Sequence, residues 1–285
     1  MRKYVYLLGN PLTHTVGPLI MQAAFDHWGL DIRCEEWELA PDQLAQAAMR
    51  IRQEDVLGAS LTIPYKESII PYLDGLDEQA QLMGAIAAIA KREEKLIGYN
   101  TDSVGFLQGL ITEGNFQPKD KRIVILGAGG AARGCSFILA SSGVASITIV
   151  NRTLSRAQGL ASELKQVCPD VQVMDYEDSR LREAIQNSEL LVNCTSFGMK
   201  WSSLDGKCPI KEGLIPRGQL VYDIVYKPLE TPLMRMAREA GARTLSGLVM
   251  VTYVCAADVK LWLDREPPIK AMFEGARKAA EQYGY

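Results

Sequence analysis

A glycine-rich turn between an apolar segment and a run of small residues is the feature that most constrains this sequence. Residues 123–126 read Ile-Val-Ile-Leu and are followed at once by Gly127-Ala128-Gly129-Gly130-Ala131-Ala132. In such a G-x-G-x-x-A turn the first glycine permits a tight bend, the second lets backbone amides approach a pyrophosphate, and a small sixth residue lets helix and strand pack closely. A strand, this turn and a helix predict a dinucleotide-binding Rossmann domain, with a purely structural turn as the alternative.

The end of the next predicted strand, residues 146–150, indicates which dinucleotide is bound. Where an NAD enzyme offers a carboxylate to the ribose, this chain has Asn151-Arg152-Thr153. The Arg152 guanidinium can pair with a 2'-phosphate, and the Thr153 hydroxyl can donate to it. The sequence therefore predicts NADP as cofactor; the alternative is an ordinary strand-end arginine with Thr153 capping the next helix. Thr195, after a later strand, is a further candidate for the nicotinamide side.

Alternating apolar segments predict an α/β fold with two domains. The first hundred residues suggest strands at 4–8, 33–39 and 57–62, helices at 18–28 and 42–52, and a hairpin over 86–97 that turns at Glu93-Glu94. Later strands are expected at 123–126, 146–150, 171–174, 189–193 and 219–225. We expect an N-terminal α/β substrate domain over residues 1–103, completed by C-terminal helices at 245–285, and a doubly wound NADP-binding domain over 104–244.

Composition excludes several classes of protein. The 285 residues are 47% hydrophobic and carry a formal net charge of -3, so no excess of cations exists to bind nucleic acid or a membrane surface. The first apolar run is too short for a signal peptide, and we expect a soluble cytoplasmic protein. Six cysteines without a C-x-x-C pair and two histidines predict no metal site; several cysteines are expected to be buried as small hydrophobes.

Two polar residues at predicted strand ends are candidates for catalysis. Lys66 follows one strand in Thr62-Ile63-Pro64-Tyr65-Lys66, and Asp102 follows another in Tyr99-Asn100-Thr101-Asp102. A lysine beside a carboxylate can relay the proton that an alcohol loses while its carbon gives up hydride. Spacing alone equally allows a solvated surface lysine and an aspartate that caps a helix.

Taken together, these segments resemble the shikimate dehydrogenase family over essentially the whole chain. The motifs are Gly9-Asn10-Pro11-Leu12-Thr13-His14, Thr62 to Lys66, Gly98 to Asp102, Gly127 to Ala132, Asn151 to Thr153, and Asp223-Ile224-Val225-Tyr226 with Thr231-Pro232-Leu233. The resemblance implies a catalytic pair at Lys66 and Asp102, carboxylate contacts at Thr15 and Tyr226, and Thr62 beside the ring. It also implies Gly247 at the cofactor and reversible, NADPH-dependent reduction of 3-dehydroshikimate in aromatic amino-acid biosynthesis.

The substrate-binding positions depart from the family pattern at four places. Gly17 replaces a serine, Ser60 an asparagine, Ala87 an asparagine and Val254 a glutamine. Each lost hydrogen bond to a hydroxylated substrate can cost about 1 kcal/mol. An alternative is therefore a paralogue with the same chemistry on a less hydroxylated cyclic hydroxy acid.

Two further alternatives remain. One is a quinate or quinate/shikimate dehydrogenase, which Ala87 and Val254 disfavour because it also needs polar partners for ring hydroxyls. The other is a non-catalytic NADP-binding sensor on the same fold. His14 is predicted to be structural rather than a general base, and the protein to be a monomer or homodimer.

Overall fold

The computed structural model describes residues 2–13 and 15–285, which divide into two compact units. The terminal unit contains the residues up to Gly105 together with Val251–Gly284, and the central unit contains Phe106–Met250 and Tyr285. The chain changes unit within two helices, α5 (Thr101–Thr112) and α10 (Gly247–Leu263). The predicted change points were 103/104 and 244/245.

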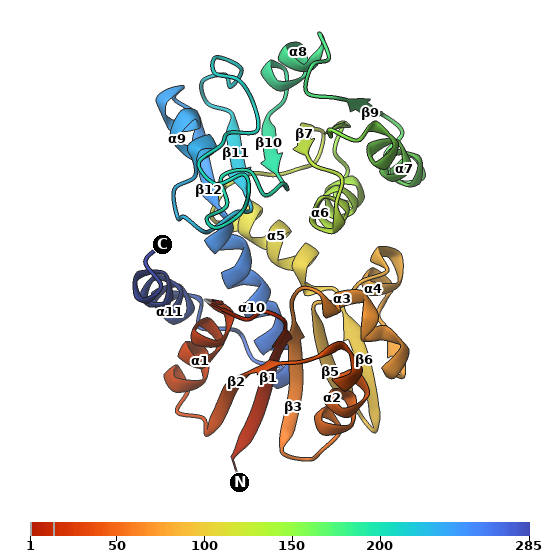
Figure 1. Cartoon of the computed structure of the whole chain (residues 1–285), viewed down its shortest axis with the longest axis vertical. Helices are drawn as coiled ribbons and strands as arrows, with labels where there is room; N and C mark the ends of the chain where they lie inside the picture. Colours follow the sequence, from red (N-terminus) through yellow and green to blue (C-terminus); the bar gives the residue numbers. More distant parts are fainter. Residues whose placement is uncertain (1, 14) are drawn as a thin grey trace. The chain divides into compact units, whose positions relative to one another are not determined.

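The terminal unit is built on a six-stranded mixed sheet with strand order β2-β1-β3-β5-β6-β4 (Figure 1). Its strands are β1 (Lys3–Gly9), β2 (Ile32–Glu38), β3 (Val56–Leu61), β4 (Gly75–Leu76), β5 (Ala88–Arg92) and β6 (Lys95–Tyr99). β1 pairs in parallel with β2 and β3, whereas β5 is antiparallel to both β3 and β6. The predicted hairpin is confirmed, with Glu93 at φ 55° in its turn.

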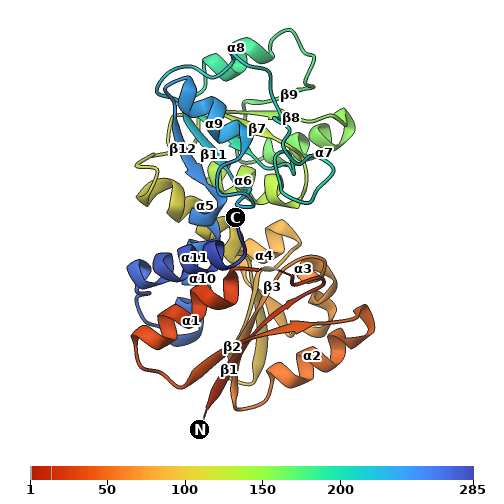
Figure 2. The same ribbon diagram turned by 60° about the vertical axis from the view of Figure 1, so that its left-hand side comes forward.

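Helices cover both faces of this sheet because its strands bury side chains on both faces. Tyr6 and Leu8 of β1 pack with Leu44 and Ile51 of α2. α1 packs against α11, as Figure 2 shows. The helices and short turns are α1 (Gly17–His27), η1 (Pro41–Gln43), α2 (Leu44–Ile51), α3 (Tyr65–Ser68), η2 (Ile70–Tyr72), α4 (Glu78–Met83) and α11 (Ile269–Gln282). The C-terminal segment therefore folds back onto the N-terminal part of the chain.

The central unit contains a fully parallel sheet with strand order β12-β11-β10-β7-β8-β9. Its strands are β7 (Arg122–Leu126), β8 (Ser146–Val150), β9 (Val171–Met174), β10 (Leu190–Asn193), β11 (Leu220–Asp223) and β12 (Arg243–Ser246), and its helices α6 (Gly130–Ser141), α7 (Leu154–Leu164), α8 (Leu181–Gln186) and α9 (Pro232–Glu239). The order reverses beside β7, which is the switch point where doubly wound folds bind dinucleotides. The predicted Rossmann-type fold is confirmed, although β4 and β12 were not predicted.

Within residues 2–13 and 15–285, no helix is both long enough and apolar enough to cross a bilayer. Cys135, Cys168 and Cys255 are buried, as expected for small hydrophobes.

Candidate active site

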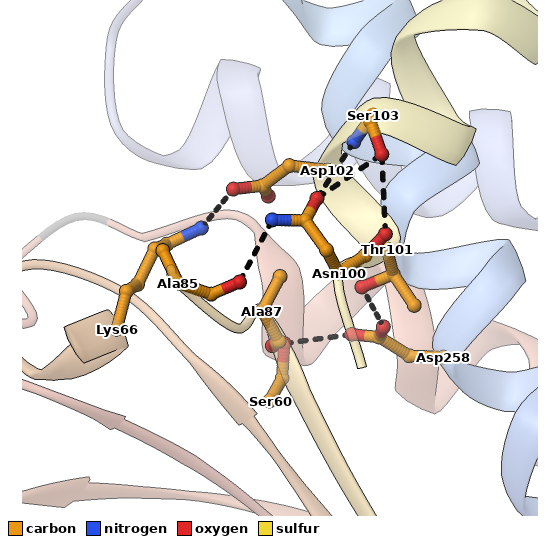
Figure 3. Close-up of polar contacts among 9 residues, drawn as sticks. All are labelled: Ser60, Lys66, Ala85, Ala87, Asn100, Thr101, Asp102, Ser103 and Asp258. Atoms are coloured by element: carbon orange, nitrogen blue, oxygen red, sulfur yellow. Dashed lines mark hydrogen bonds and ion pairs between the residues drawn. The ribbon is translucent and has the colours of Figure 1, made fainter. Parts of the chain in front are cut away.

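Lys66 and Asp102 form an ion pair in the terminal unit. Lys66 lies in α3, which follows β3, and Asp102 lies in the first turn of α5. The Lys66 ammonium donates to Asp102 Oδ2, and the two side chains point toward each other in Figure 3. The Lys66 and Asp102 side chains remain 26% and 32% exposed, so a ligand can reach both. A proton donor thus stands beside a carboxylate, the arrangement that general acid-base catalysis requires.

The backbone around Lys66 is held by its neighbours. Tyr65 is 2% exposed, and its hydroxyl donates to the Leu39 carbonyl oxygen. The Lys66 carbonyl accepts from the Ile86 amide at 2.8 Å. Because these contacts anchor the short helix, they hold the backbone of Lys66 in place.

Asn100, not Asp102, caps the N-terminus of α5. The Asn100 side-chain oxygen accepts from the Ser103 amide at 3.2 Å, and its Nδ2 donates to the Ala85 carbonyl at 2.9 Å. The alternative in which Asp102 caps the helix is therefore wrong, because Asn100 occupies that position and leaves the Asp102 carboxylate available to Lys66. The alternative of a solvated surface Lys66 is also wrong, since its ammonium is paired.

A buried carboxylate, which was not predicted from the sequence, lies beside this pair. Asp258 of α10 is 0% exposed. It accepts from the Ser60 hydroxyl at 2.7 Å and from the Thr101 hydroxyl at 2.6 Å (Figure 3). Burial raises the pKa of Asp258 to about 7, against the opposing effect of these two hydrogen bonds; Asp102 raises it further and Lys66 lowers it. The one available signal was an acidic residue within an otherwise largely apolar helix.

The predicted substrate-binding residues differ in what they offer to a ligand. Thr15 and Thr62 are partly exposed in the terminal unit. Ser60 is 6% exposed, with its hydroxyl directed at Asp258, and Ala87 is fully buried. Gly17 begins α1, and Val254 packs so closely on Gly105 that a Cβ added there would lie 2.5 Å from Val254 Cγ2. Tyr226 belongs to the central unit, and His14 lies outside the described residues.

The glycine turn of the central unit is shaped to receive a phosphate. Gly127 has φ +110°, and a Cβ there would lie 3.1 Å from the Cys194 carbonyl oxygen, so the position requires glycine. Gly129 is the N-cap of α6 without a side-chain cap, and a Cβ on Gly129 or Gly130 would meet nothing within 4 Å. Open space in front of uncapped helix amides fits a pyrophosphate. Ala131 and the buried Ala132 continue the helix.

Arg152 stands exposed after β8 and is available to an anion. It forms no hydrogen bond or ion pair with any residue in the described ranges 2–13 and 15–285. Thr153 is the N-cap residue of α7, yet its hydroxyl makes no cap hydrogen bond. Asn151 instead supports the turn, donating from Nδ2 to the Thr153 carbonyl at 2.8 Å. The alternative of a helix-capping Thr153 side chain is therefore not supported, and the residues fit a 2'-phosphate.

Thr195 belongs to a second hydrogen-bond network, at the ends of β10 and β11. Its hydroxyl donates to Asn193 Oδ1 at 2.6 Å, and Asn193 Nδ2 donates to Asp223 at 2.9 Å. Asp223 also accepts from the Thr231 hydroxyl at 2.6 Å. Burial raises the pKa of Asp223 to about 6, against the opposing effect of its hydrogen bonds from Thr231, the Val225 amide and Asn193. These contacts fix the loop that carries Thr195.

Gly247 is required by backbone packing at the start of α10. A Cβ at this position would lie 2.0 Å from the Ile224 carbonyl oxygen. Elsewhere in the described ranges 2–13 and 15–285, no group of three or more His, Cys, Asp or Glu side chains is placed to hold a metal ion.

Comparison with known families and proteins agrees with these two units. Residues 7–89 match the shikimate dehydrogenase substrate binding domain, and residues 111–200 match the shikimate / quinate 5-dehydrogenase family. The chain is 41% identical to a shikimate dehydrogenase (NADP(+)) of Moorella thermoacetica, over 96% of this chain and 92% of that protein.

Solved structures are similar over nearly the full length. Shikimate 5-dehydrogenase of Thermus thermophilus, in complex with NADP(H) and shikimate, is 32% identical with a TM-score of 0.86 and coverage of 97% and 99% of the two chains. The 5-ketofructose reductase of Gluconobacter sp. strain CHM43 is 30% identical, with a TM-score of 0.88 and coverage of 98% and 99%. Identity and coverage at this level, together with the Lys66–Asp102 pair and the glycine turn, show that the chain belongs to the shikimate dehydrogenase family.

Proposed function

We propose that this protein is an NADP-dependent oxidoreductase that reversibly reduces 3-dehydroshikimate to shikimate. The observation that carries the proposal is the Lys66–Asp102 ion pair. Lys66 falls in the segment matched by the shikimate dehydrogenase substrate binding domain. The names of the relatives support the substrate and the cofactor, because one is a shikimate dehydrogenase (NADP(+)) and another was solved with NADP(H) and shikimate.

In the direction of reduction, the Lys66 ammonium donates its proton to the substrate carbonyl oxygen, which becomes the hydroxyl of the product. NADPH, when bound, supplies the hydride that is added to the carbonyl carbon. Asp102 accepts a hydrogen bond from the ammonium and orients it. In the direction of oxidation the neutral Lys66 amine takes the hydroxyl proton.

The remaining residues are assigned by chemistry. We assign Thr15 and Tyr226 to the substrate carboxylate and Thr62 to the ring, since hydroxyl groups donate well to carboxylates. Gly127, Gly129, Gly130, Ala131 and Ala132 are assigned to the pyrophosphate, and Asn151, Arg152 and Thr153 to the 2'-phosphate. Thr195 and Gly247 are assigned to the nicotinamide side.

Replacement of Lys66 tests the proposed function. In Lys66→Ala, kcat with 3-dehydroshikimate and NADPH should fall about 10²–10⁴-fold, because the proton donor is gone. NADP affinity measured by calorimetry should stay unchanged. The matched control is Lys95→Ala, which removes an exposed lysine of the same unit. Equal turnover by Lys66→Ala and Lys95→Ala would contradict the catalytic role. Wild-type protein that binds NADP but shows no turnover would indicate an NADP-binding sensor.

A second candidate function is the same reaction on a less hydroxylated cyclic hydroxy acid. It is favoured by the buried Ala87, by Val254 packed on Gly105, and by the Ser60 hydroxyl that Asp258 engages. The relative named 5-ketofructose reductase is a protein of similar fold with another substrate in its name.

Restoring polar groups separates the two candidates. If the second is correct, Ala87→Asn and Val254→Gln should raise kcat/KM for shikimate, by about fivefold for each recovered hydrogen bond. High wild-type activity on shikimate with no gain in the variants would favour the first candidate.

We further propose that the enzyme acts in the cytoplasm as a monomer or homodimer on a small-molecule substrate. Cell fractionation and analytical ultracentrifugation test these two statements.

A further inference from the structure

We propose that Asp258 is a positioning residue for the Lys66–Asp102 pair, because one buried carboxylate holds both chain segments that carry the pair. The inference rests on the proposed function, in which this pair relays the proton. Asp258 does not act on the substrate itself, since it is 0% exposed.

The contacts of Asp258 reach two separate chain segments. Ser60 lies near the end of β3, the strand that leads into α3 and Lys66. Thr101 directly precedes Asp102 at the start of α5. Asp258 lies on α10, and it accepts hydrogen bonds from Ser60 at 2.7 Å and Thr101 at 2.6 Å. A single side chain is therefore hydrogen-bonded to both chain segments that carry the pair (Figure 3).

Both hydrogen bonds to Asp258 are buried. Ser60 and Thr101 are each 6% exposed, so water does not readily replace the carboxylate as their acceptor. Removing Asp258 leaves the Thr101 hydroxyl without the acceptor seen here, whereas Ser60 can turn to the Ala87 carbonyl at 3.4 Å. A buried hydroxyl that loses its partner is destabilised, so we expect the start of α5, which carries Thr101 and Asp102, to shift.

Charge also couples Asp258 to the pair. Asp102 and Lys66 are the charged groups that act on Asp258, the first disfavouring and the second favouring its ionised form. The thiols of Cys34 and Cys255 also face it, and burial raises the pKa of both thiols, so they stay neutral in the neutral pH range. An ionised Asp258 attracts the Lys66 cation, so a change in the charge of Asp258 changes the electrostatic environment of the pair.

Two substitutions separate position from charge. Asp258→Asn can keep both contacts, because its amide oxygen accepts from Thr101 and its NH₂ donates to Ser60, which then donates to Ala87. Asp258→Ala keeps neither contact. Asp31→Asn is the matched control, since it removes a carboxylate of the same unit whose side chain is 62% exposed.

The kinetic measurement is kcat and KM for 3-dehydroshikimate between about pH 5 and about pH 9. In Asp258→Ala, kcat should fall about 10–100-fold with little change in KM, because the pair is misplaced while the substrate contacts remain. The neutral amide of Asp258→Asn resembles the protonated carboxyl. This variant should therefore keep most of kcat at the acidic end of the range but lose the inflection near neutral pH. Wild-type kcat and pH profiles in both variants would overturn the inference.

A second measurement needs no turnover. The carboxyl carbon of Asp258, followed by NMR during a pH titration, should titrate at a higher pH in Lys66→Met than in the wild type, because the Lys66 cation lowers the Asp258 pKa. An unchanged titration would overturn the coupling. If this shift occurs but wild-type protein does not reduce 3-dehydroshikimate, only the proposed function fails. If the wild type is active and the Asp258 variants match it, only this inference fails.

Discussion

Asp258 Oδ1 accepts a hydrogen bond of 2.6 Å from the Thr101 hydroxyl, although 157 positions separate the two residues in the chain. The contact joins α10 to the first turn of α5, where Asp102 lies beside Lys66. Its cost is the burial of a carboxylate, which gives the protein a pH-dependent stability.

Asp258→Asn should make the stability of the protein less dependent on pH. The folded pKa of Asp258 is raised from 3.8 to about 7, so its favourable contribution is fully present below about pH 4 and is lost as the pH rises through about 7. The neutral amide does not titrate. The quantity to compare is the free energy of unfolding of the variant minus that of the wild type, measured by urea denaturation. This difference should be about 1–3 kcal/mol more favourable to the variant at about pH 8 than at about pH 4. The same gain in Asp31→Asn would show that burial of Asp258 is not the cause.

Arg152→Ala should weaken NADP binding about 10–100-fold, because a charge-assisted pair with the 2'-phosphate is lost. NAD affinity should hardly change, since NAD lacks that phosphate. Isothermal titration calorimetry with both dinucleotides checks this, and Arg182→Ala, another exposed arginine of the central unit, is the control. Equal losses for NAD and NADP would place Arg152 away from the 2'-phosphate.

Gly127→Ala should destabilise the central unit by about 1–3 kcal/mol and reduce dinucleotide affinity. The position has φ +110° and lies against the Cys194 carbonyl. Gly159→Ala, in the exposed middle of α7, should instead stabilise by about 0.5–1 kcal/mol. Thermal unfolding of the two variants side by side compares them; similar melting temperatures would contradict the expected strain.

Asn193→Ala should destabilise the protein by about 1–3 kcal/mol, because Asp223 loses one of its donors. Burial raises the pKa of Asp223 to about 6, so the carboxylate is mostly ionised at about pH 8 and mostly protonated at about pH 5. The ionised form needs the Asn193 donor more. The loss in urea denaturation should therefore be larger at about pH 8 than at about pH 5, and a loss independent of pH would argue against this account.

Much of the fold was predictable because its signals are local. The strand from residues 146–150 and the strand from 171–174 were predicted with the bounds that β8 and β9 have. Two strands were missed for a physical reason: β4 has 2 residues, and β12 has the polar sequence Arg-Thr-Leu-Ser. Neither contains enough apolar alternation to be distinguished from a loop.

The sequence by itself determined the α/β character of the two domains, the glycine turn and the arginine after β8, since each depends on residues within a few positions of one another. Only the tertiary structure decided that Lys66 meets Asp102, that Asn100 takes the cap position, and that Asp258 engages Ser60 across 198 positions. Hydrogen bonds between distant segments leave no periodic pattern in the chain. They form where the packing of β3, α5 and α10 brings buried polar groups together, and each such group must find its partner there.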